Sequence, residues 1–420
     1  MVGASVGKRP REQGSCSPLR GLLTAVDGLS RYDQVRGAVT ITSATQSTEV
    51  IHAGDFFSAR RFGRYILVEL LSPHRVISTS AHQGGQRTDF SFLANHQSCE
   101  ASSDARRQEH IANLGLVAYH REVCAEMGVD PDRTALMGTA ANMAYACHRW
   151  AEFDDVRADA IITAGVSGNA AKAGDPASWH EQDEGWKQVA PYAGTINVML
   201  LLNCPLTASA QARAVVTLTE AKSSVLAELA VPSRYSAAIA TGTGTDQFCL
   251  ATPLDPQLRA RDSTSPHTKL GEIIGTSVRE ALREALCWQN GLEPSYTRGL
   301  FHALGRFGLT EERAMASLAR RLPEQGYGLL AKNPKAVFYE PGVAAAAHAF
   351  AAVLDRIAYG TLPRGSANDA LRQQAACLAC SLAARREQWP RFYEQLPAQP
   401  DDPIEFVLQA LALGWTAKWT

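Results

Sequence analysis

The sequence predicts an α/β fold, a mixed sheet with flanking helices, followed by an α-helical C-terminal region. Two observations support this prediction. From about residue 32 to residue 251, β-branched segments alternate with helical ones, which is typical of helices packed on a sheet. After Thr264 the β-branched segments stop, and helices follow one another with short Gly/Pro breaks. We therefore expect a disordered tail over 1–30, an α/β domain over 31–290 and a helical domain over 291–420.

The predicted strands are short β-branched runs: Ala38–Ile41, Tyr65–Leu71, Val76–Thr79, Ala160–Thr163, Thr195–Leu202, Ala237–Ala240 and Phe248–Ala251. The predicted helices are Ser102–Met127, Ala140–Trp150, a helix capped by Thr207 that runs to about Leu229, His267–Gln289, Ala314–Arg321, Ala344–Ile357 and Ala370–Glu387. Ser265 is the predicted N-cap of the long helix near residue 267, with Pro266 at its first position.

Composition excludes several classes of protein. The 41 Lys and Arg residues nearly balance the 42 Asp and Glu residues, which argues against a nucleic-acid or anionic-membrane partner. No apolar run approaches the ~20 residues that a membrane span needs. The nine cysteines are an odd number in a chain long enough to build a core without disulfides, and the start lacks a secretory apolar run. We expect a reduced cytoplasmic protein.

Two glycine-containing loops follow predicted strands, where α/β sheets usually bind ligands. Taken alone, the first loop is more typical of a plain surface turn. The second lacks the Gly-Lys-Ser/Thr of a phosphate-binding loop, and Asn169 stands where a nucleophile elbow requires glycine. A backbone cradle for an oxyanion or a polar ligand is the more plausible function. The candidate substrate-binding residues in the two loops are Gly84, Gly85, Gly165, Ser167, Asn169 and Asp175.

Two further segments place polar side chains beside strands. Thr195 and Asn197 share one face of their strand, and the Asn197 amide either orients a substrate amide or is structural. Thr243, Thr245 and Asp246 form a row of oxygens separated by glycines. A Gly-rich turn does not require so many oxygens, so we favour a functional site here over a plain hairpin turn.

Lys222 lies in the centre of the apolar stripe of the helix that begins after Thr207. It either extends to the edge of the stripe or turns inward to a site. Glu220 lies nearly opposite on the helical wheel. His267 and Lys269 stand in the first turn of the next helix, where the helix dipole disfavours positive charge, so a neutral His267 is a candidate general base and Lys269 a candidate anion ligand.

The sequence predicts no metal site. No His-Glu-x-x-His occurs, the eleven histidines show no close ligand spacing, and Cys377 and Cys380 lie in an alanine-rich segment typical of core packing.

Six segments occur in one order: Ser78-Thr-Ser-Ala to Gly85, Thr163-Ala-Gly-Val-Ser to Asp175, Gly194-Thr-Ile-Asn197, Thr219-Glu-Ala-Lys222, Ala240-Thr-Gly-Thr-Gly-Thr-Asp246 and His267-Thr-Lys-Leu-Gly271. This series resembles the adenosylcobinamide amidohydrolase (CbiZ) family over about residues 56–286. The resemblance implies hydrolysis of the amide that joins the aminopropanol arm to the corrin ring, giving adenosylcobyric acid in corrinoid salvage. The partner would be a corrinoid small molecule. No separate cofactor is expected, because the cobalt belongs to the substrate.

On this resemblance we expect Glu220 or His267 to act as base, Lys222 and loop N–H groups near Gly165 to stabilise the oxyanion, Asp246 to orient, and Asn197 to hold the amide. Two alternatives stay open. His82 and Gln83, which precede the double glycine, permit another metal-chelate amide such as a siderophore as substrate. A non-catalytic corrinoid-binding protein is the other alternative. The helical C-terminal region has two open roles, self-association into a homo-oligomer or a lid.

Overall fold

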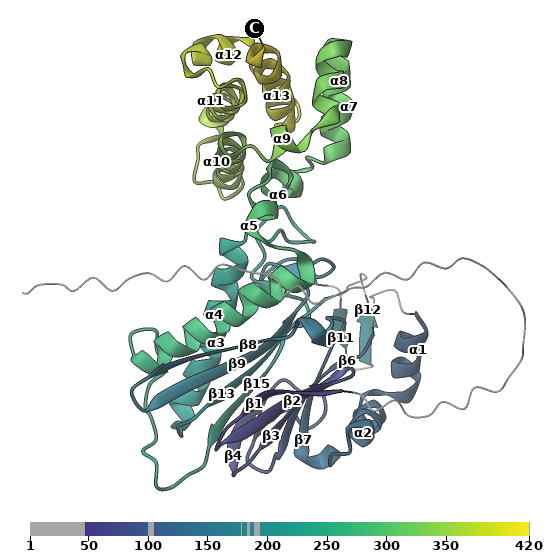
Figure 1. Ribbon diagram of the computed structural model, residues 1–420, viewed down its shortest axis with the longest axis vertical. Helices are drawn as coiled ribbons and strands as arrows, with labels where there is room; N and C mark the ends of the chain where they lie inside the picture. The colour runs from purple at the N-terminus through teal and green to yellow at the C-terminus, as the bar shows by residue number, and fades with distance from the viewer. Residues whose placement is uncertain (1–46, 100–104, 178, 183–184, 189–193, 420) are drawn as a thin grey trace, which may run out of the picture. The chain divides into compact units, whose positions relative to one another are not determined.

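The computed structural model describes residues 47–99, 105–177, 179–182, 185–188 and 194–419. Its larger part contains two sheets (Figure 1). The five-stranded sheet has the order β1-β2-β3-β6-β7, from β1 (Thr48–Ala53), β2 (Phe57–Phe62), β3 (Tyr65–Leu70), β6 (Phe92–Gln97) and β7 (Thr134–Thr139). The six-stranded sheet has the order β5-β4-β15-β13-β9-β8, from β4 (His74–Ser78), β5 (Gly85–Arg87), β8 (Cys147–Phe153), β9 (Val156–Ala164), β13 (Ile196–Leu202) and β15 (Gln247–Pro253).

Both sheets are mixed, as predicted. β6 and β7 are parallel, and so are β13 and β15, while the other neighbours in these two sheets are antiparallel. Two small ribbons complete the strands: β10 (Ala170–Ala171) pairs with β14 (Gly242–Thr243), and β11 (Trp179–Gln182) pairs with β12 (Gly185–Gln188).

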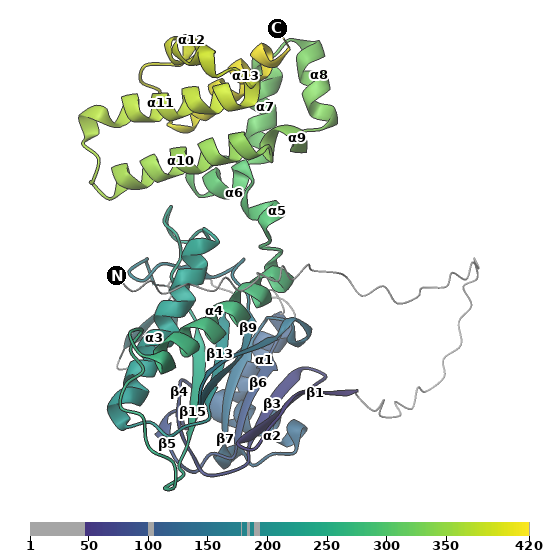
Figure 2. The same ribbon diagram turned by 60° about the vertical axis from the view of Figure 1, so that its left-hand side comes forward.

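The sheets and helices form four layers. Helices α3 (Ala208–Glu228) and α4 (Lys269–Asn290) cover one face of the six-stranded sheet through a large apolar core (Figures 1 and 2). The other face packs on the five-stranded sheet through side chains such as Ile66, Met199 and Leu201. Helix α2 (Leu116–Met127), which follows α1 (Ala105–Leu114), covers the outer face of the five-stranded sheet.

The C-terminal region is helical, as predicted, and has its own core, which includes Phe338, Phe350 and Phe406. Cys380 belongs to this core, whereas Cys377 is exposed. The helices are α5 (Pro294–Thr297), α6 (Leu300–Leu304), α7 (Glu311–Arg321), α8 (Glu324–Lys332), α9 (Lys335–Phe338), α10 (Pro341–Ala358), α11 (Arg364–Ala383), α12 (Trp389–Gln395) and α13 (Ile404–Lys418). Among the described residues, no helix is both long and apolar enough to cross a membrane.

Two predicted elements are wrong. The predicted helix Ala140–Trp150 is a short 3₁₀ turn capped by Asn142 followed by strand β8, because pairing with β9 overrides the helix propensity of the alanines. The predicted strand Ala237–Ala240 is a loop with one isolated bridge from Ile239 to Pro232. The predicted strand Ala38–Ile41 and the predicted tail 1–30 lie outside the described residues.

Two predicted helix boundaries also shift. The predicted helix 102–127, described from residue 105, is broken in two at Gly115, which has φ of 79°. The N-cap of α4 is Thr268 rather than Ser265, and its hydroxyl accepts from the Gly271 N–H at 3.2 Å. The backbone oxygen of Ser265 instead accepts from the Thr268 hydroxyl at 2.8 Å.

Candidate functional site

Three loops converge at one end of the six-stranded sheet. The parallel strands β13 and β15 begin side by side, with Asn197 opposite Gln247. Strand β9 is antiparallel to β13 and ends at Ala164 opposite Ile196. The loops 165–169, 194–195 and 240–246 therefore meet at this end, which is the carboxyl end of β9 and the amino end of β13 and β15.

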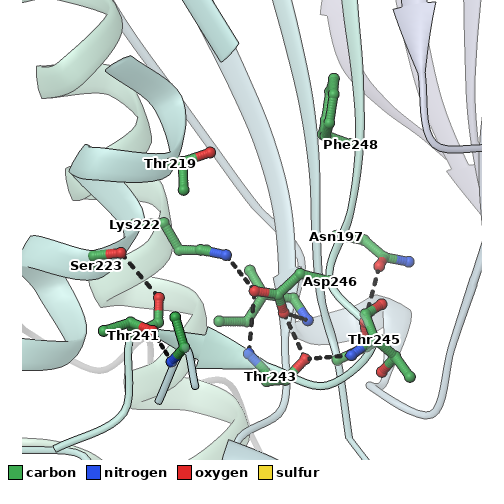
Figure 3. Close-up of polar contacts among 12 residues, drawn as sticks. Asn197, Thr219, Lys222, Ser223, Thr241, Thr243, Thr245, Asp246 and Phe248 are labelled. Carbon is green, nitrogen blue, oxygen red and sulfur yellow. Dashed lines mark hydrogen bonds and ion pairs between the residues drawn. The ribbon is translucent and has the colours of Figure 1, made fainter. Parts of the chain in front are cut away.

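Lys222 turns inward to this end of the sheet. Thr207 caps α3, and its hydroxyl accepts from the Ala210 N–H at 3.3 Å. On the helix that follows, Lys222 forms an ion pair with Asp246, and their side chains are only 12% and 17% exposed (Figure 3). Of the two conformations open to a lysine in an apolar stripe, the inward one is present.

The carboxylate of Asp246 is held by several donors. One oxygen accepts from the Ile196 N–H at 3.1 Å and from the Thr243 hydroxyl at 2.5 Å. The other accepts from the Thr243 N–H at 3.1 Å and from Lys222. A carboxylate has about four acceptor positions, so Asp246 has no capacity left to take a proton from a water as a base. Lys222, by contrast, has one hydrogen-bond partner among the described side chains. Because an ammonium group carries three protons, Lys222 can still donate hydrogen bonds to a ligand.

The glycines beside Asp246 are required by close packing. A Cβ on Gly242 would lie 2.5 Å from an Asp246 carboxylate oxygen and 2.8 Å from the Lys222 Nζ. A Cβ on Gly244 would lie 3.0 Å from the Asn169 side-chain oxygen. The alternation of Gly and Thr in this segment therefore allows one loop to contact both the ion pair and Asn169.

Asn169 is wholly buried and joins the three loops. Its amide nitrogen donates to the Gly194 carbonyl at 2.9 Å and contacts the Thr245 hydroxyl at 3.3 Å, and its oxygen accepts from the Tyr235 hydroxyl at 2.6 Å. The hydroxyl of Thr245 also donates to the Gly194 carbonyl, at 2.7 Å. Asn169 and Thr245 therefore organise the site, and their side chains are engaged with protein groups.

Asn197 faces the five-stranded sheet instead of the ion pair. Its amide nitrogen donates to the Asn95 side-chain oxygen at 2.9 Å and to the Gly138 carbonyl at 3.1 Å. The Thr195 hydroxyl donates to the Thr245 carbonyl at 2.6 Å and contacts the Asn197 oxygen at 3.3 Å. Both side chains belong to a buried polar layer between the sheets, as the structural alternative for Asn197 predicts.

The backbone N–H groups of the loop after β9 donate to neighbouring protein groups. The Gly165 N–H donates to the Thr195 carbonyl at 2.9 Å, and the Val166 N–H donates to the Asn290 side chain at 3.2 Å. These two N–H groups are thus engaged and do not point to an oxyanion in this conformation. The exposed Ser167 hydroxyl accepts from the Asn290 amide at 2.7 Å.

Asp175 closes the turn at the end of this loop. It accepts from the Lys172 N–H at 2.8 Å and from the Ser233 hydroxyl at 2.5 Å. Burial alone would raise the pKa of Asp175, but these hydrogen bonds outweigh it and hold the pKa below the ordinary value.

The double glycine lies at the same end of the sheet. Gly85 opens β5 with φ of 89°, and Gly84 packs so closely that a Cβ would lie 2.2 Å from the Ser80 carbonyl. Thr79, just before this turn, is hydrogen-bonded to the backbone of Phe248, which follows Asp246 by two residues.

Three candidate residues are not brought to the ion pair. Glu220 is exposed on α3, on a different side of the helix from Lys222. His267 and Lys269 stand at the start of α4, and the Lys269 Nζ lies 4.9 Å from the ring centroid of Phe153, where β8 ends. The other end of α4 contacts the 165–167 loop, and a helix of 22 residues is about 33 Å long, so His267 lies at the opposite end of the sheet.

Several residues around the ion pair and the buried polar layer were not among the predicted site residues. Thr219 precedes Lys222 by three residues and lies on the same side of α3 (Figure 3). The spacing within Thr219-Glu-Ala-Lys222 was a usable signal for Thr219. Tyr235 and Asn95 had no signal, because each reaches the site from a segment distant in the sequence.

Comparison with protein families gives a match over residues 48–294 to the adenosylcobinamide amidohydrolase model, which is more than half of the chain. The chain belongs to the adenosylcobinamide amidohydrolase family. The matched segment contains both sheets and the Lys222–Asp246 pair, and it ends where the C-terminal helices begin. The family assigns the chain to amide hydrolysis in cobinamide metabolism, with a corrinoid small molecule as substrate.

A relative is found in Methanocaldococcus jannaschii. This uncharacterized protein is 34% identical over 184 residues, which cover 42% of the present chain and 71% of the relative.

Proposed function

We propose that this amidohydrolase cleaves the secondary amide that joins the aminopropanol arm of adenosylcobinamide to the corrin ring. Family membership supports the amide substrate and the corrinoid. The inward ion pair between Lys222 and Asp246 is the observation that carries the assignment of the site.

The reaction adds water to the amide carbonyl. The tetrahedral intermediate carries a negative oxygen, the C–N bond then breaks, and the nitrogen leaves with a proton that comes from the added water. The products are adenosylcobyric acid and 1-amino-2-propanol. Such a reaction needs a donor for the negative oxygen, because that charge develops in the transition state and its stabilisation is usually the largest single contribution to the rate.

Lys222 is suited to be this donor. Its ammonium group is fixed by Asp246, which is itself held by the Ile196 and Thr243 N–H groups. The remaining protons of Lys222 are free of hydrogen-bonded partners among the described residues. A preorganised cation in a largely buried site stabilises a developing oxyanion without having to reorient. Asp246 orients Lys222, and no proton transfer is assigned to it.

The test is a product assay with purified full-length protein and adenosylcobinamide, followed by mass spectrometry for the new carboxylate. Lys222→Met is expected to lower kcat by about 10²- to 10³-fold, the usual effect of losing one oxyanion donor. Arg213→Met, which removes an exposed cation from the same helix, is the matched control and should keep activity within about twofold. Circular dichroism of both variants checks that they are folded.

The same assay separates the alternatives. Tight binding of adenosylcobinamide without product identifies a corrinoid-binding protein. Neither binding nor product points to another chelate amide as substrate. Wild-type turnover that survives Lys222→Met removes Lys222 from the mechanism.

A further inference from the structure

Two histidines and an aspartate meet at the edges of the two sheets. His52 lies on β1, the edge strand of the five-stranded sheet, and His148 lies on β8, the edge strand of the six-stranded sheet. Asp159 lies on the neighbouring strand β9. One ligand atom from each of these side chains lies within 4.8 Å of the others. Sequence spacing gave no signal, because the residues come from separate strands.

A β-bulge aims His52 at this place. The pairing of β1 with β2 shifts by one residue between Val50 and His52, so that His52 stands opposite Ala59. Ala59 is buried in the core between the sheets, so the shift turns His52 to the side that faces the six-stranded sheet. Bulges often re-aim a side chain in this way next to functional sites.

The register of β8 and β9 places the other two side chains. Trp150 is opposite Asp159, and His148 precedes Trp150 by two residues, so His148 and Asp159 lie on one face of the sheet. The Nε2 atom of His148 is 2.9 Å from an Asp159 carboxylate oxygen. The ring centroids of His52 and His148 are 5.5 Å apart.

The three side chains differ in what they already contact. The Asp159 carboxylate accepts hydrogen bonds from Arg157 and lies within hydrogen-bond distance of His148. Within the described residues, His52 makes no hydrogen bond, so a ring nitrogen is available as a ligand.

We propose that His52, His148 and Asp159 bind one divalent transition-metal ion of the zinc type. Two imidazoles and a carboxylate are a usual ligand set for such ions, with water in the remaining position. Binding of the ion replaces the direct contact between His148 Nε2 and the Asp159 carboxylate.

Arg157 acts on the carboxylate from outside this set. It donates to the two Asp159 oxygens at 2.8 Å and 2.8 Å, which fixes the carboxylate as outer partners of metal ligands commonly do. Glu152, with an oxygen 3.8 Å from Arg157, offsets part of the positive charge.

The bound ion links the two sheets and takes no part in amide hydrolysis. Asp159 pairs with Leu201, near the end of β13, whereas the Lys222–Asp246 pair lies where β13 begins. The inference is therefore independent of the proposed function.

The test uses the full chain, stripped with chelator and dialysed against Zn²⁺ or Co²⁺. We expect the wild type to bind one ion per chain more than the His52→Ala variant does. We also expect visible absorption from bound Co²⁺ and a higher melting temperature when metal is present. His52→Ala keeps the His148, Arg157 and Asp159 contacts, so it should fold, and it should lose the Co²⁺ bands and weaken binding about tenfold or more.

His110→Ala is the matched control, because His110 forms a histidine–carboxylate pair with Glu122 at 3.0 Å, and the described residues place no second histidine in a ligand group with that pair. It should bind metal like the wild type. The proposal is overturned if the wild type takes up no ion, or if His52→Ala binds as well as the wild type. If His52→Ala binds as well as the wild type, the ion is held by cysteines or other groups. The cluster of His52, His148 and Asp159 is then an ion-pair network alone.

Discussion

Replacement of Asn197 by alanine tests whether the polar layer between the sheets is structural. The Asn197 side chain is wholly buried, and it donates to the Asn95 oxygen at 2.9 Å and to the Gly138 carbonyl at 3.1 Å. Alanine leaves both acceptors without this donor in a place shielded from water. A buried group that loses its partner costs about 1–3 kcal/mol, so we expect Asn197→Ala to lower the free energy of unfolding by about 2–5 kcal/mol.

Urea unfolding followed by circular dichroism measures this loss, and adenosylcobinamide turnover is measured in parallel. Asn142→Ala is the control, because Asn142 is an exposed cap whose oxygen accepts one hydrogen bond at 2.8 Å, and its loss should cost about 1 kcal/mol. If Asn197→Ala changes stability by less than about 0.5 kcal/mol while KM rises about tenfold, Asn197 binds substrate and the structural assignment is refuted.

Two other predictions concern stability. Gly244→Ala should lower the free energy of unfolding by about 1–3 kcal/mol, because the added Cβ would lie 3.0 Å from the fixed Asn169 side-chain oxygen. Gly275→Ala is the control, because Gly275 is a helical glycine with open space around it, and alanine there should raise the free energy of unfolding by about 0.5–1 kcal/mol in the same urea experiment. Equal effects of the two substitutions would contradict this reasoning. Burial lowers the pKa of His74 from 6.5, so the unfolded chain takes up a proton that the folded one resists; stability is complete above pH 6.5 and falls below it. Melting temperatures from pH 7.5 to 5 should fall less steeply for His74→Gln, and an unchanged slope would exclude His74.

Much of the fold could be predicted because local pattern and tertiary contact agree. Thr195–Leu202 reads as a buried strand and is one from Ile196, and Thr207 caps a helix as expected. The helix predicted for residues 140–150 was wrong, because the alanines favour a helix but the pairing of β8 with β9 decides the structure of this segment. Strand β1 was missed because it is an edge strand with little burial.

The site was predictable where one segment supplied both signal and side chain. Lys222 and Asp246 stood out as a cation in an apolar stripe and as the end of a Gly/Thr row, and the structure joins them. His267 follows the same motif order, yet α4 carries it to the other end of the sheet. The order of motifs along the chain does not show at which end of the sheet a helix residue lies. That is set by the direction in which the helix crosses the sheet.

Strand β13 has two different sides with separate consequences. Ile196, Val198 and Leu200 face the helices, whereas Met199 and Leu201 face the second sheet, where Asn197 also points. Engineering of substrate preference can therefore start from the positions of helix α3 next to Lys222, because the 240–246 loop is itself fixed by close packing. Libraries built on α3 leave the buried polar layer behind the strand untouched.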